Sequence, residues 1–449
     1  MKVWILVSLC AVAFAKHEIY TGWKSYYVAP ATQEQLSILG SLESKLDVDY
    51  FVRPRVDREG VALVKPRYQE EFLNILVKEG ISHRVHSKDI KSQLDIEDEL
   101  IEARHAEFRA RSTPEKPYDN YLRLDAIYNY MDEVAANHPN IVKQVTAGRS
   151  FEGRPIKYLK ISSTNFEDTS KSVIFVDATM HAREWITTPA ALYAIHKLVE
   201  NRTDPELLDH FDWIIMPMSN PDGYEYSHTN ERFWRKTRSF DRNLISFLCR
   251  GVDGNRNFDF HWGTVGTSDH NCADIYPGTK PFSENETRVV RDVLKENLSR
   301  MILYITIHSY GSMILYPWGH DGSLSNNALG LHTVGVAMAD AIYAKTLPVF
   351  PRYTVGNSLL VIGYGSSGAA EDYAHSIGVP LTYTYELPGI EHDYDDDDDD
   401  DEDDDDDFAN DDHLKGFHLD PQYIRPVAEE TWEGISVGAK RARAIVRSK

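Results

Sequence analysis

Two arrangements of apolar and polar positions follow one another along the chain. Between residues 16 and 100, apolar runs at 50–52 and 60–64 are interspersed with amphipathic stretches at 34–46 and 68–79. Alternating apolar positions are typical of half-buried strands, and a period near 3.6 residues is typical of helices. The first region therefore predicts a small α+β domain.

From residue 118 onward, strand-like and helix-like segments alternate. In order, they are a strand at 172–177, a helix at 187–200, a strand at 213–218, a helix at 283–297, a strand at 302–307, a helix at 331–347, a strand at 379–386 and a helix at 421–446. This alternation predicts an α/β sheet covered by helices. Ligand sites in such sheets collect at the carboxyl ends of the strands, so the residues that follow each strand are the candidates for chemistry.

A charged, helical segment at 96–111 joins the two regions. It carries Arg104, Arg109 and Arg111, and the following Ser112-Thr-Pro-Glu-Lys-Pro117 ends any helix. An exposed basic junction is a place where a trypsin-like protease cuts. A prosegment released at this junction and an ordinary interdomain linker are both open at this point.

The net charge is carried mostly by one segment. The chain has a formal charge of −22, and residues 391–413 contain 15 Asp and 2 Glu without any Lys or Arg. A surplus of acid argues against nonspecific nucleic-acid binding, which needs surplus Lys and Arg. The acidic stretch itself is open to four interpretations: a solvated, self-repelling loop without a specific role, steering of cationic peptides, calcium binding, or contact with a basic matrix partner.

The amino terminus has the pattern of a secretory signal peptide over residues 1–15. Lys2 precedes an apolar run at 4–14, and Ala13-Phe-Ala15 is a small-x-small cleavage pattern. The run is too short to span a bilayer. We therefore expect a secreted, extracellular protein; the alternative is a buried first strand or helix of the domain.

Secretion changes the interpretation of the three cysteines. Cys10 would leave with the signal, and Cys249 and Cys272 would remain as a pair in an oxidising compartment. We predict one disulfide, which would add roughly 3 kcal/mol in the chain-entropy model; two buried free thiols are the alternative. Asn201, Asn285 and Asn297 begin glycosylation sequons, so the chain can be a glycoprotein.

Three potential metal ligands follow predicted strands. His181 and Glu184 are three residues apart after the first strand of the second region, and His308 closes the strand at 302–307. Two imidazoles and a carboxylate are the ligand types of a catalytic zinc that keeps a fourth position open for water. By itself, the His-x-x-Glu spacing is a weak signal that arises by chance, and a surface ion pair is the simpler interpretation of it.

Six further motifs, in a fixed order, make the chain resemble a known family. They are Gly148-Arg-Ser-Phe-Glu-Gly-Arg-Pro155, His181-Ala-Arg-Glu184, Trp234-Arg-Lys-Thr-Arg-Ser239, Gly251-Val-Asp-Gly-Asn-Arg-Asn257, Ile307-His-Ser-Tyr310 and Thr384-Tyr-Glu-Leu387. Over nearly its whole length the chain resembles the zinc metallocarboxypeptidases of the pancreatic A/B type, which are secreted as proenzymes.

This resemblance implies an architecture. We expect a mixed, eight-stranded α/β sheet flanked by helices, preceded by the α+β prodomain. The expected divisions are a signal peptide at 1–15, an activation propeptide at 16–111, and a catalytic domain at 112–449 with an acidic insertion at 391–413. The prodomain would act as inhibitor until a trypsin-like protease cuts after Arg111, and the disulfide matches that of the family. The protein would be a monomer that binds neither nucleic acid nor membranes.

The resemblance also implies roles for individual residues. His181, Glu184 and His308 would hold one zinc ion per chain. Glu386 would act as general base, and Arg235 would face the carbonyl oxygen and stabilise the oxyanion. The remaining substrate-binding roles fall to Asn255 and Arg256 for the terminal carboxylate, Tyr364 for closing over the bound residue, and Arg183 and Tyr310 for subsites further along the peptide.

Specificity depends on the position seven residues after Tyr364. That position is apolar in A-type relatives and Asp in B-type relatives, and here it is Glu371. A carboxylate in a pocket favours a cationic partner because an unpaired buried charge is costly. Leu315, Gly319 and Leu359 resemble A-type residues, so we expect basic terminal residues to be slightly favoured, with aromatic or aliphatic ones close behind.

Two other functions are alternatives, and the residues present argue against both. An inactive, carboxypeptidase-like binding protein could use the acidic stretch as its working surface, although such a protein is expected to lose a ligand or the base. An endopeptidase on the same metal conflicts with the carboxylate clamp of Asn255 and Arg256. The acidic stretch follows Glu386, where the family has only a short loop, and we hypothesise that it affects substrate entry.

Overall fold

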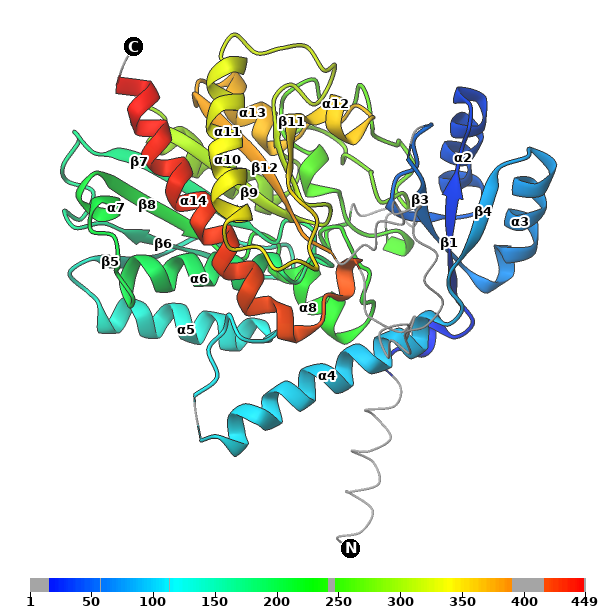
Figure 1. Ribbon diagram of the computed structural model, residues 1–449, viewed down its shortest axis with the longest axis horizontal. Coiled ribbons are helices and arrows are strands. Elements are labelled where there is room, and N and C mark those ends of the chain that lie inside the picture. Colours follow the sequence, from blue (N-terminus) through cyan, green and yellow to red (C-terminus); the bar gives the residue numbers. More distant parts are fainter. Residues whose placement is uncertain (1–15, 57, 113, 241–246, 390–415, 448–449) are drawn as a thin grey trace, which may run out of the picture.

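The computed structural model describes residues 16–56, 58–112, 114–240, 247–389 and 416–447 (Figure 1). The predicted signal peptide at 1–15 and the acidic stretch at 391–413 lie outside the described residues. Among the residues that are described, no helix combines the length and the apolar character needed to cross a membrane.

The N-terminal region forms an antiparallel, four-stranded sheet in the order β2-β3-β1-β4. Its elements are η1 Glu18–Tyr20, β1 Lys24–Ala29, α2 Gln33–Lys45, β2 Asp49–Val52, β3 Gly60–Val64, η2 Pro66–Tyr68, α3 Gln69–Lys78 and β4 Ser82–Ser87. Apolar residues of both helices, including Leu39 and Phe72, pack on this sheet. The predicted α+β domain is confirmed.

A long helix, α4 (Ile90–Ala110), carries the chain from this domain to the second one (Figure 1). The side chain of Asp89 accepts a hydrogen bond from the backbone N–H of Ser92 and caps the helix. Ile90 and Leu94, one turn apart, are both buried. The helix therefore begins six residues before the charged segment from which the sequence predicted it.

The second region contains an eight-stranded sheet in the order β11-β10-β12-β9-β7-β8-β6-β5. The four central strands, β12, β9, β7 and β8, are parallel to one another, and antiparallel pairs occur on both sides of them. The strands are β5 Val142–Arg149, β6 Pro155–Ile161, β7 Ser172–Ala178, β8 Phe211–Met216, β9 Met301–Ser309, β10 Met313–Tyr316, β11 Thr354–Asn357 and β12 Leu381–Leu387. The predicted mixed, eight-stranded α/β sheet is confirmed.

Helices cover both faces of this sheet because its central strands are apolar on both sides. Along β7, Ile174 and Val176 face one core cluster, and Val173 and Phe175 face another. The first cluster includes residues of α5, α6, α11 and α14, and the second includes residues of α10 and α13. The helices are α5 Leu124–Asn137, α6 Thr187–Val199, α7 Glu206–Asp209, α8 Pro221–Thr229, η3 Gly254–Arg256, α10 Asn285–Asn297, α11 Ala328–Tyr343, α12 Ser358–Ile362, α13 Ala370–Ser376, η4 Gly416–His418, η5 Pro421–Tyr423 and α14 Ile424–Arg447.

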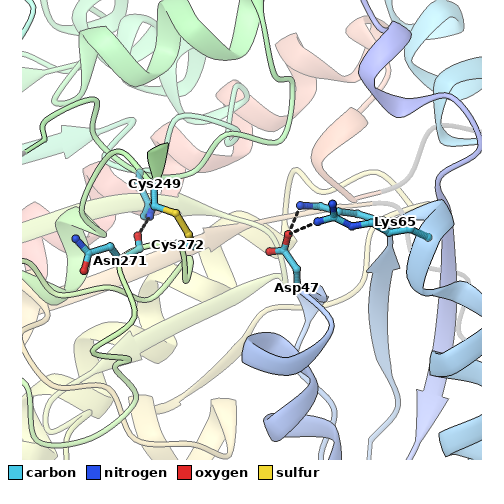
Figure 2. Close-up of a disulfide and its surroundings, with 7 residues drawn as sticks. Asp47, Lys65, Cys249, Asn271 and Cys272 are labelled. Carbon is cyan, nitrogen blue, oxygen red and sulfur yellow. Dashed lines mark hydrogen bonds and ion pairs between the residues drawn. A yellow bond between two sulfur atoms is a disulfide. The ribbon is translucent and has the colours of Figure 1, made fainter. Parts of the chain in front are cut away.

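The predicted disulfide between Cys249 and Cys272 is present. It lies in the loops of the second domain and faces the first domain, where Asp47 and Lys65 form an ion pair (Figure 2). Both pairs of residues line one cavity of about 330 Å³. The disulfide therefore stabilises a part of the second domain that borders the N-terminal domain.

A buried ion pair joins the two domains. Glu97 of α4 accepts hydrogen bonds from Arg232 Nε (2.7 Å) and Nη2 (2.8 Å), and neither side chain is exposed. Arg232 also donates to the carbonyl oxygen of Arg183 and lies 3.6 Å from the ring centre of Trp185. An apolar cluster also joins the two domains, and it consists of Tyr20, Leu63, Ile90 and Leu94 of the first domain and Phe233 and Phe417 of the second.

We predict that Glu97→Ala destabilises the full-length protein by about 3–5 kcal/mol, because the substitution leaves the Arg232 charge buried without its partner. Glu102→Ala is the matched control on the same helix, since Glu102 forms an exposed pair with Arg109. That change should cost less than about 1 kcal/mol. Denaturant unfolding followed by near-UV circular dichroism measures both, and equal destabilisation by the two variants would contradict the prediction.

Candidate metal and catalytic site

The three predicted metal ligands meet at the carboxyl edge of the central parallel strands. His181 and Glu184 lie in the loop after β7, and His308 lies near the end of β9, the neighbouring strand. Parallel neighbours end at the same edge of a sheet, so residues 124 positions apart in the chain come into contact. These three candidate ligands therefore lie at the carboxyl edge of the sheet, as the sequence predicted.

Their donor atoms converge on one point. Glu184 Oε1 lies 2.7 Å from His181 Nδ1, Glu184 Oε2 lies 3.0 Å from His308 Nδ1, and the two Nδ1 atoms are 3.0 Å apart. All three side chains are buried, and among the described residues they are the single group of three or more such side chains close enough to share a metal ion. Two imidazole nitrogens and a carboxylate fit a zinc ion.

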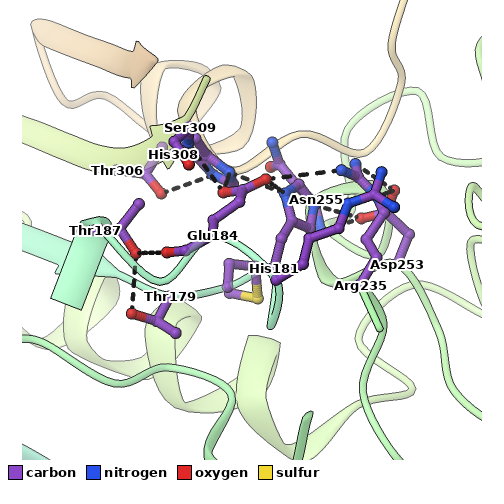
Figure 3. Close-up of polar contacts among 12 residues, drawn as sticks. Thr179, His181, Glu184, Thr187, Arg235, Asp253, Asn255, Thr306, His308 and Ser309 are labelled. Atoms are coloured by element: carbon purple, nitrogen blue, oxygen red, sulfur yellow. Dashed lines mark hydrogen bonds and ion pairs between the residues drawn. The ribbon is translucent and has the colours of Figure 1, made fainter. Parts of the chain in front are cut away.

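Hydrogen bonds of Thr179 and Thr187 hold the loop that carries His181 and Glu184 (Figure 3). Thr179 has a positive φ of 59°, which turns the chain sharply after β7. Its hydroxyl lies 3.1 Å from that of Thr187, and the Thr187 hydroxyl donates to the carbonyl oxygen of Glu184 (2.7 Å). The ligand loop is therefore held in place by the start of α6.

Asp253 supports the site, and the sequence analysis gave it no role. Its Oδ1 lies 2.9 Å from His181 Nε2, the ring nitrogen that points away from Glu184. Its Oδ2 accepts a hydrogen bond from Arg235 Nη2 (2.9 Å), and Arg235 Nη1 lies 3.8 Å from Glu184 Oε1. The signal that could have identified Asp253 is its place inside the motif at 251–257.

Glu386 lies directly opposite His308 in the pairing of β12 with β9. Burial raises the pKa of the Glu386 carboxyl to about 8, against the lowering effect of His308. A carboxyl with a raised pKa beside a candidate metal site can exchange a proton near neutral pH.

One cavity of about 140 Å³, lined by residues of both domains, collects most of the predicted site residues. They are His181, Arg183, Glu184, Arg235, Asn255, Arg256, Tyr310, Tyr364, Glu371 and Glu386, and His308 joins them through its contact with Glu184. Asn255 Oδ1 accepts the backbone N–H of Ala370 (2.8 Å), which fixes the orientation of its amide. Arg256 Nη1 donates to the carbonyl oxygen of Asn255 (2.8 Å).

Residues of the N-terminal domain line one side of this cavity. Arg183 Nη1 donates to Asp49 Oδ2 (2.6 Å). The guanidinium of Arg53 lies 5.2 Å from the ring centre of Tyr364. The first domain thus contacts two of the predicted substrate-binding side chains.

Glu371 is buried on α13, and its carboxylate is only partly satisfied. Ser358 Oγ donates to Glu371 Oε1 at 3.5 Å, and Oε2 has no hydrogen-bond partner among the described residues. Burial and the neighbouring Asp372 raise the pKa of Glu371 to about 7.

The three positions that resemble A-type relatives differ in where they lie. Leu315 lines the same cavity as Glu371. Gly319 lies against Ser358, which donates to Glu371, whereas Leu359 packs against Gly322.

Comparison with known proteins agrees with this geometry. A family model described as zinc carboxypeptidase matches residues 127–434, and one described as carboxypeptidase activation peptide matches residues 26–97. The chain is 56% identical to a protein named carboxypeptidase B from Helicoverpa zea over 448 residues, with both chains fully covered. It is 30% identical to zinc carboxypeptidase A 1 of Drosophila melanogaster over 436 residues, which cover 95% of this chain and 93% of that one.

Among solved structures, the carboxypeptidase A from Helicoverpa armigera matches with a TM-score of 0.87 and 41% identity. The match covers 95% of this chain and 99% of that one. Family, sequence relatives and fold agree with a buried two-histidine, one-carboxylate site that fits zinc. The chain therefore belongs to the zinc carboxypeptidase family and is a zinc-dependent peptidase that is made together with an activation peptide.

Proposed function

We propose that the chain is a secreted procarboxypeptidase whose catalytic domain, residues 112–449, removes the last residue of peptides and proteins and prefers basic residues. The observation that carries the preference is the buried Glu371, whose Oε2 has no partner among the described residues, in the same cavity as the metal-ligand candidates. A cationic side chain from the substrate would supply that partner.

Asn255 and Arg256 are proposed to select the end of the peptide. A planar guanidinium pairs with a carboxylate through two parallel hydrogen bonds, and an internal residue of a peptide has no carboxylate to offer. Asn255 is oriented by the backbone of Ala370 and can donate its amide N–H groups to the same ligand. The two residues limit cleavage to the last peptide bond.

His181, Glu184 and His308 are proposed to hold the zinc ion, which supplies a Lewis acid that polarises the carbonyl group and lowers the pKa of water. Glu386 takes the proton from the attacking water and passes it to the leaving amine. Arg235, held by Asp253, faces the carbonyl oxygen and stabilises its developing negative charge.

Three further residues are proposed to bind the substrate. Tyr364 closes over the terminal residue, and the glycines that flank it, Gly363 and Gly365, permit the movement. Arg183 and Tyr310 contact residues further from the cleaved bond.

The preference for basic residues follows from the cost of leaving the Glu371 carboxylate unpaired in a buried pocket. Ser366 and Thr384 also line the cavity and add hydroxyl groups that suit a polar side chain. Met313 and Leu315 line the same cavity and allow apolar terminal residues as weaker substrates.

The N-terminal domain is proposed to inhibit the enzyme until it is removed. Asp49 and Arg53 contact Arg183 and Tyr364, which the substrate needs. Helix α4 ends at Ala110, and the side chains of Arg109 and Arg111 are 64% and 68% exposed, so a trypsin-like protease can reach the proposed cleavage site after Arg111. The mature enzyme is proposed to act as an extracellular monomer.

Trypsin is predicted to convert the secreted protein into an active enzyme that begins at Ser112. Activity on blocked dipeptides should appear only after trypsin treatment and should be lost with a zinc chelator. In the double variant Arg109→Gln/Arg111→Gln, trypsin should release little activity, whereas the single variant Arg109→Gln should still be activated. N-terminal sequencing and dipeptide hydrolysis measure these outcomes, and full activity before trypsin treatment would contradict inhibition by the first domain.

Glu386→Gln is predicted to lower kcat by about 10²- to 10⁴-fold, because the amide cannot accept a proton from water. The zinc content of the variant should remain that of the unmodified protein, since Glu386 is not a proposed ligand. Metal analysis and dipeptide kinetics of the trypsin-treated variant measure both quantities. Near-normal kcat in a zinc-loaded variant would exclude Glu386 as the base.

Glu371→Gln is predicted to lower kcat/KM on an Arg-terminal dipeptide by roughly 100-fold, about 2.7 kcal/mol, and to change kcat/KM on a Phe-terminal dipeptide by less than about threefold. The substitution removes the charge that pairs with the basic side chain and keeps the shape of the pocket. Glu430→Gln is the matched control, because Glu430 is a buried carboxylate on α14.

A second readout uses the raised pKa of Glu371. The carboxyl ionises as the pH rises through about 7, so the Arg/Phe preference of the unmodified enzyme should increase between about pH 6 and pH 8. The variant should lose this pH dependence. An Arg/Phe ratio that is the same in both proteins would mean that Glu371 does not set specificity.

A further inference from the structure

The two histidines of the proposed zinc site differ in the group that lies next to the Nε2 atom of each ring. His181 presents Nδ1 to Glu184, and its Nε2 lies 2.9 Å from a carboxylate oxygen of Asp253. His308 also presents Nδ1 to Glu184, but its Nε2 lies 3.3 Å from the hydroxyl of Thr306 (Figure 3). Thr306 and His308 are two residues apart on β9, so both point to the same face of the sheet.

Behind Thr306 lies a buried carboxylate that is not fully satisfied. Asp177 of β7 is directly opposite Thr306 in the pairing of β7 with β9, and it is 0% exposed. Its Oδ2 accepts a hydrogen bond from the hydroxyl of Tyr304 (2.9 Å). Its Oδ1 has no hydrogen-bond partner among the described residues. A buried carboxylate oxygen without a partner is costly, so its position calls for an explanation.

The hydrogen-bond donors and acceptors along this line of side chains can be assigned consistently, starting from His308. When a neutral His308 offers the lone pair of Nδ1 to a metal ion, Nε2 carries the proton and must donate it. The Thr306 oxygen accepts that hydrogen bond, which leaves the Thr306 hydroxyl hydrogen free to point elsewhere. Asp177, opposite in the sheet, offers the unsatisfied Oδ1 as its acceptor.

We propose that Thr306 and Asp177 are positioning residues for His308, forming a relay in which His308 Nε2–H donates to Thr306 Oγ1 and Thr306 Oγ1–H donates to Asp177 Oδ1. The Tyr304 hydroxyl holds the other carboxylate oxygen. Every buried donor and acceptor of the relay is then satisfied. The inference rests on the proposed role of His308 as a zinc ligand.

The relay has two consequences for the site. It fixes the His308 tautomer with Nδ1 free for the metal, and it holds the ring at one angle, so less freedom is lost when zinc binds. The two histidines are thus supported by carboxylates in different ways, His181 by Asp253 directly and His308 by Asp177 through a hydroxyl group. Asp177, Thr306 and His308 all belong to the two central strands, β7 and β9, which makes the relay rigid.

Thr306→Val tests the relay, because valine keeps the shape of threonine and lacks the hydroxyl group. Zinc affinity of the full-length proenzyme, measured by competition with a chromophoric chelator, should fall by about 10- to 100-fold. Thr306→Ser, which restores the hydroxyl group, should bind zinc within about threefold of the unmodified protein. Asp177→Asn, which keeps the shape and removes the charge, should also weaken zinc binding.

Thr382→Val is the matched control. Thr382 lies on β12, opposite Tyr304 and on the other side of β9, is fully buried, and has a hydroxyl group without a hydrogen-bond partner among the described residues. Removing that hydroxyl should leave zinc affinity unchanged. Near-UV circular dichroism of the zinc-free proteins identifies any variant whose fold is altered.

Three outcomes would overturn the relay: zinc binding by Thr306→Val as tight as that of Thr382→Val, equal weakening by Thr306→Ser and Thr306→Val, or unchanged binding by Asp177→Asn. His308→Ala separates failure of the relay from failure of the ligand assignment. If His308→Ala binds zinc normally, His308 is not a ligand, and the proposed function itself must be revised. If His308→Ala loses zinc and Thr306→Val does not, only the relay is wrong.

Discussion

The free-energy cost of burying charged side chains determines how the charged residues of this protein are paired. The cavity at the carboxyl edge of the sheet contains carboxylates and guanidinium groups within a few ångströms of one another, and burial without a partner would cost several kcal/mol for each. In Asp253, both carboxylate oxygens have partners that offset this penalty: one faces His181, and the other accepts a hydrogen bond from Arg235. Where such pairing is incomplete, as at Glu371, the unpaired atom marks a place where the substrate is expected to complete it.

The same constraint shapes the contact between the first domain and the second. The first domain presents Asp49 to Arg183 and Glu97 to Arg232, and the Arg232 side chain also donates to the backbone of Arg183. Asp49 therefore contacts the loop that carries Glu184 directly, and Glu97 contacts it through Arg232. Under the proposed activation, removal of the first domain would leave both guanidinium groups without these partners, and Arg183 would become available to a peptide.

Sequence patterns predicted the elements that bury a continuous apolar run or stripe. Strand β7 and helix α6 were predicted because each is long and strongly patterned, whereas β5 and β6 were not, since β5 in particular is mostly polar and lies at the edge of the sheet. The ligand candidates were found because their residue types carry chemistry and their motifs resemble a family. Asp253 was overlooked because its role depends on a contact with a residue 72 positions away.

Strand register determines which of these residues lie next to one another. The register between two strands cannot be predicted from the sequence of either strand alone. A shift of one residue between β7 and β9 would turn Asp177 away from Thr306, and the same shift between β9 and β12 would move Glu386 away from His308. His308, Thr306, Asp177 and Glu386 therefore sit on strands, where the hydrogen-bond ladder fixes them, and His181 and Glu184 follow directly in the loop after β7. Arg256 and Tyr364, which we propose bind the substrate, sit outside the strands, where the chain can vary and move without disturbing the candidate metal site.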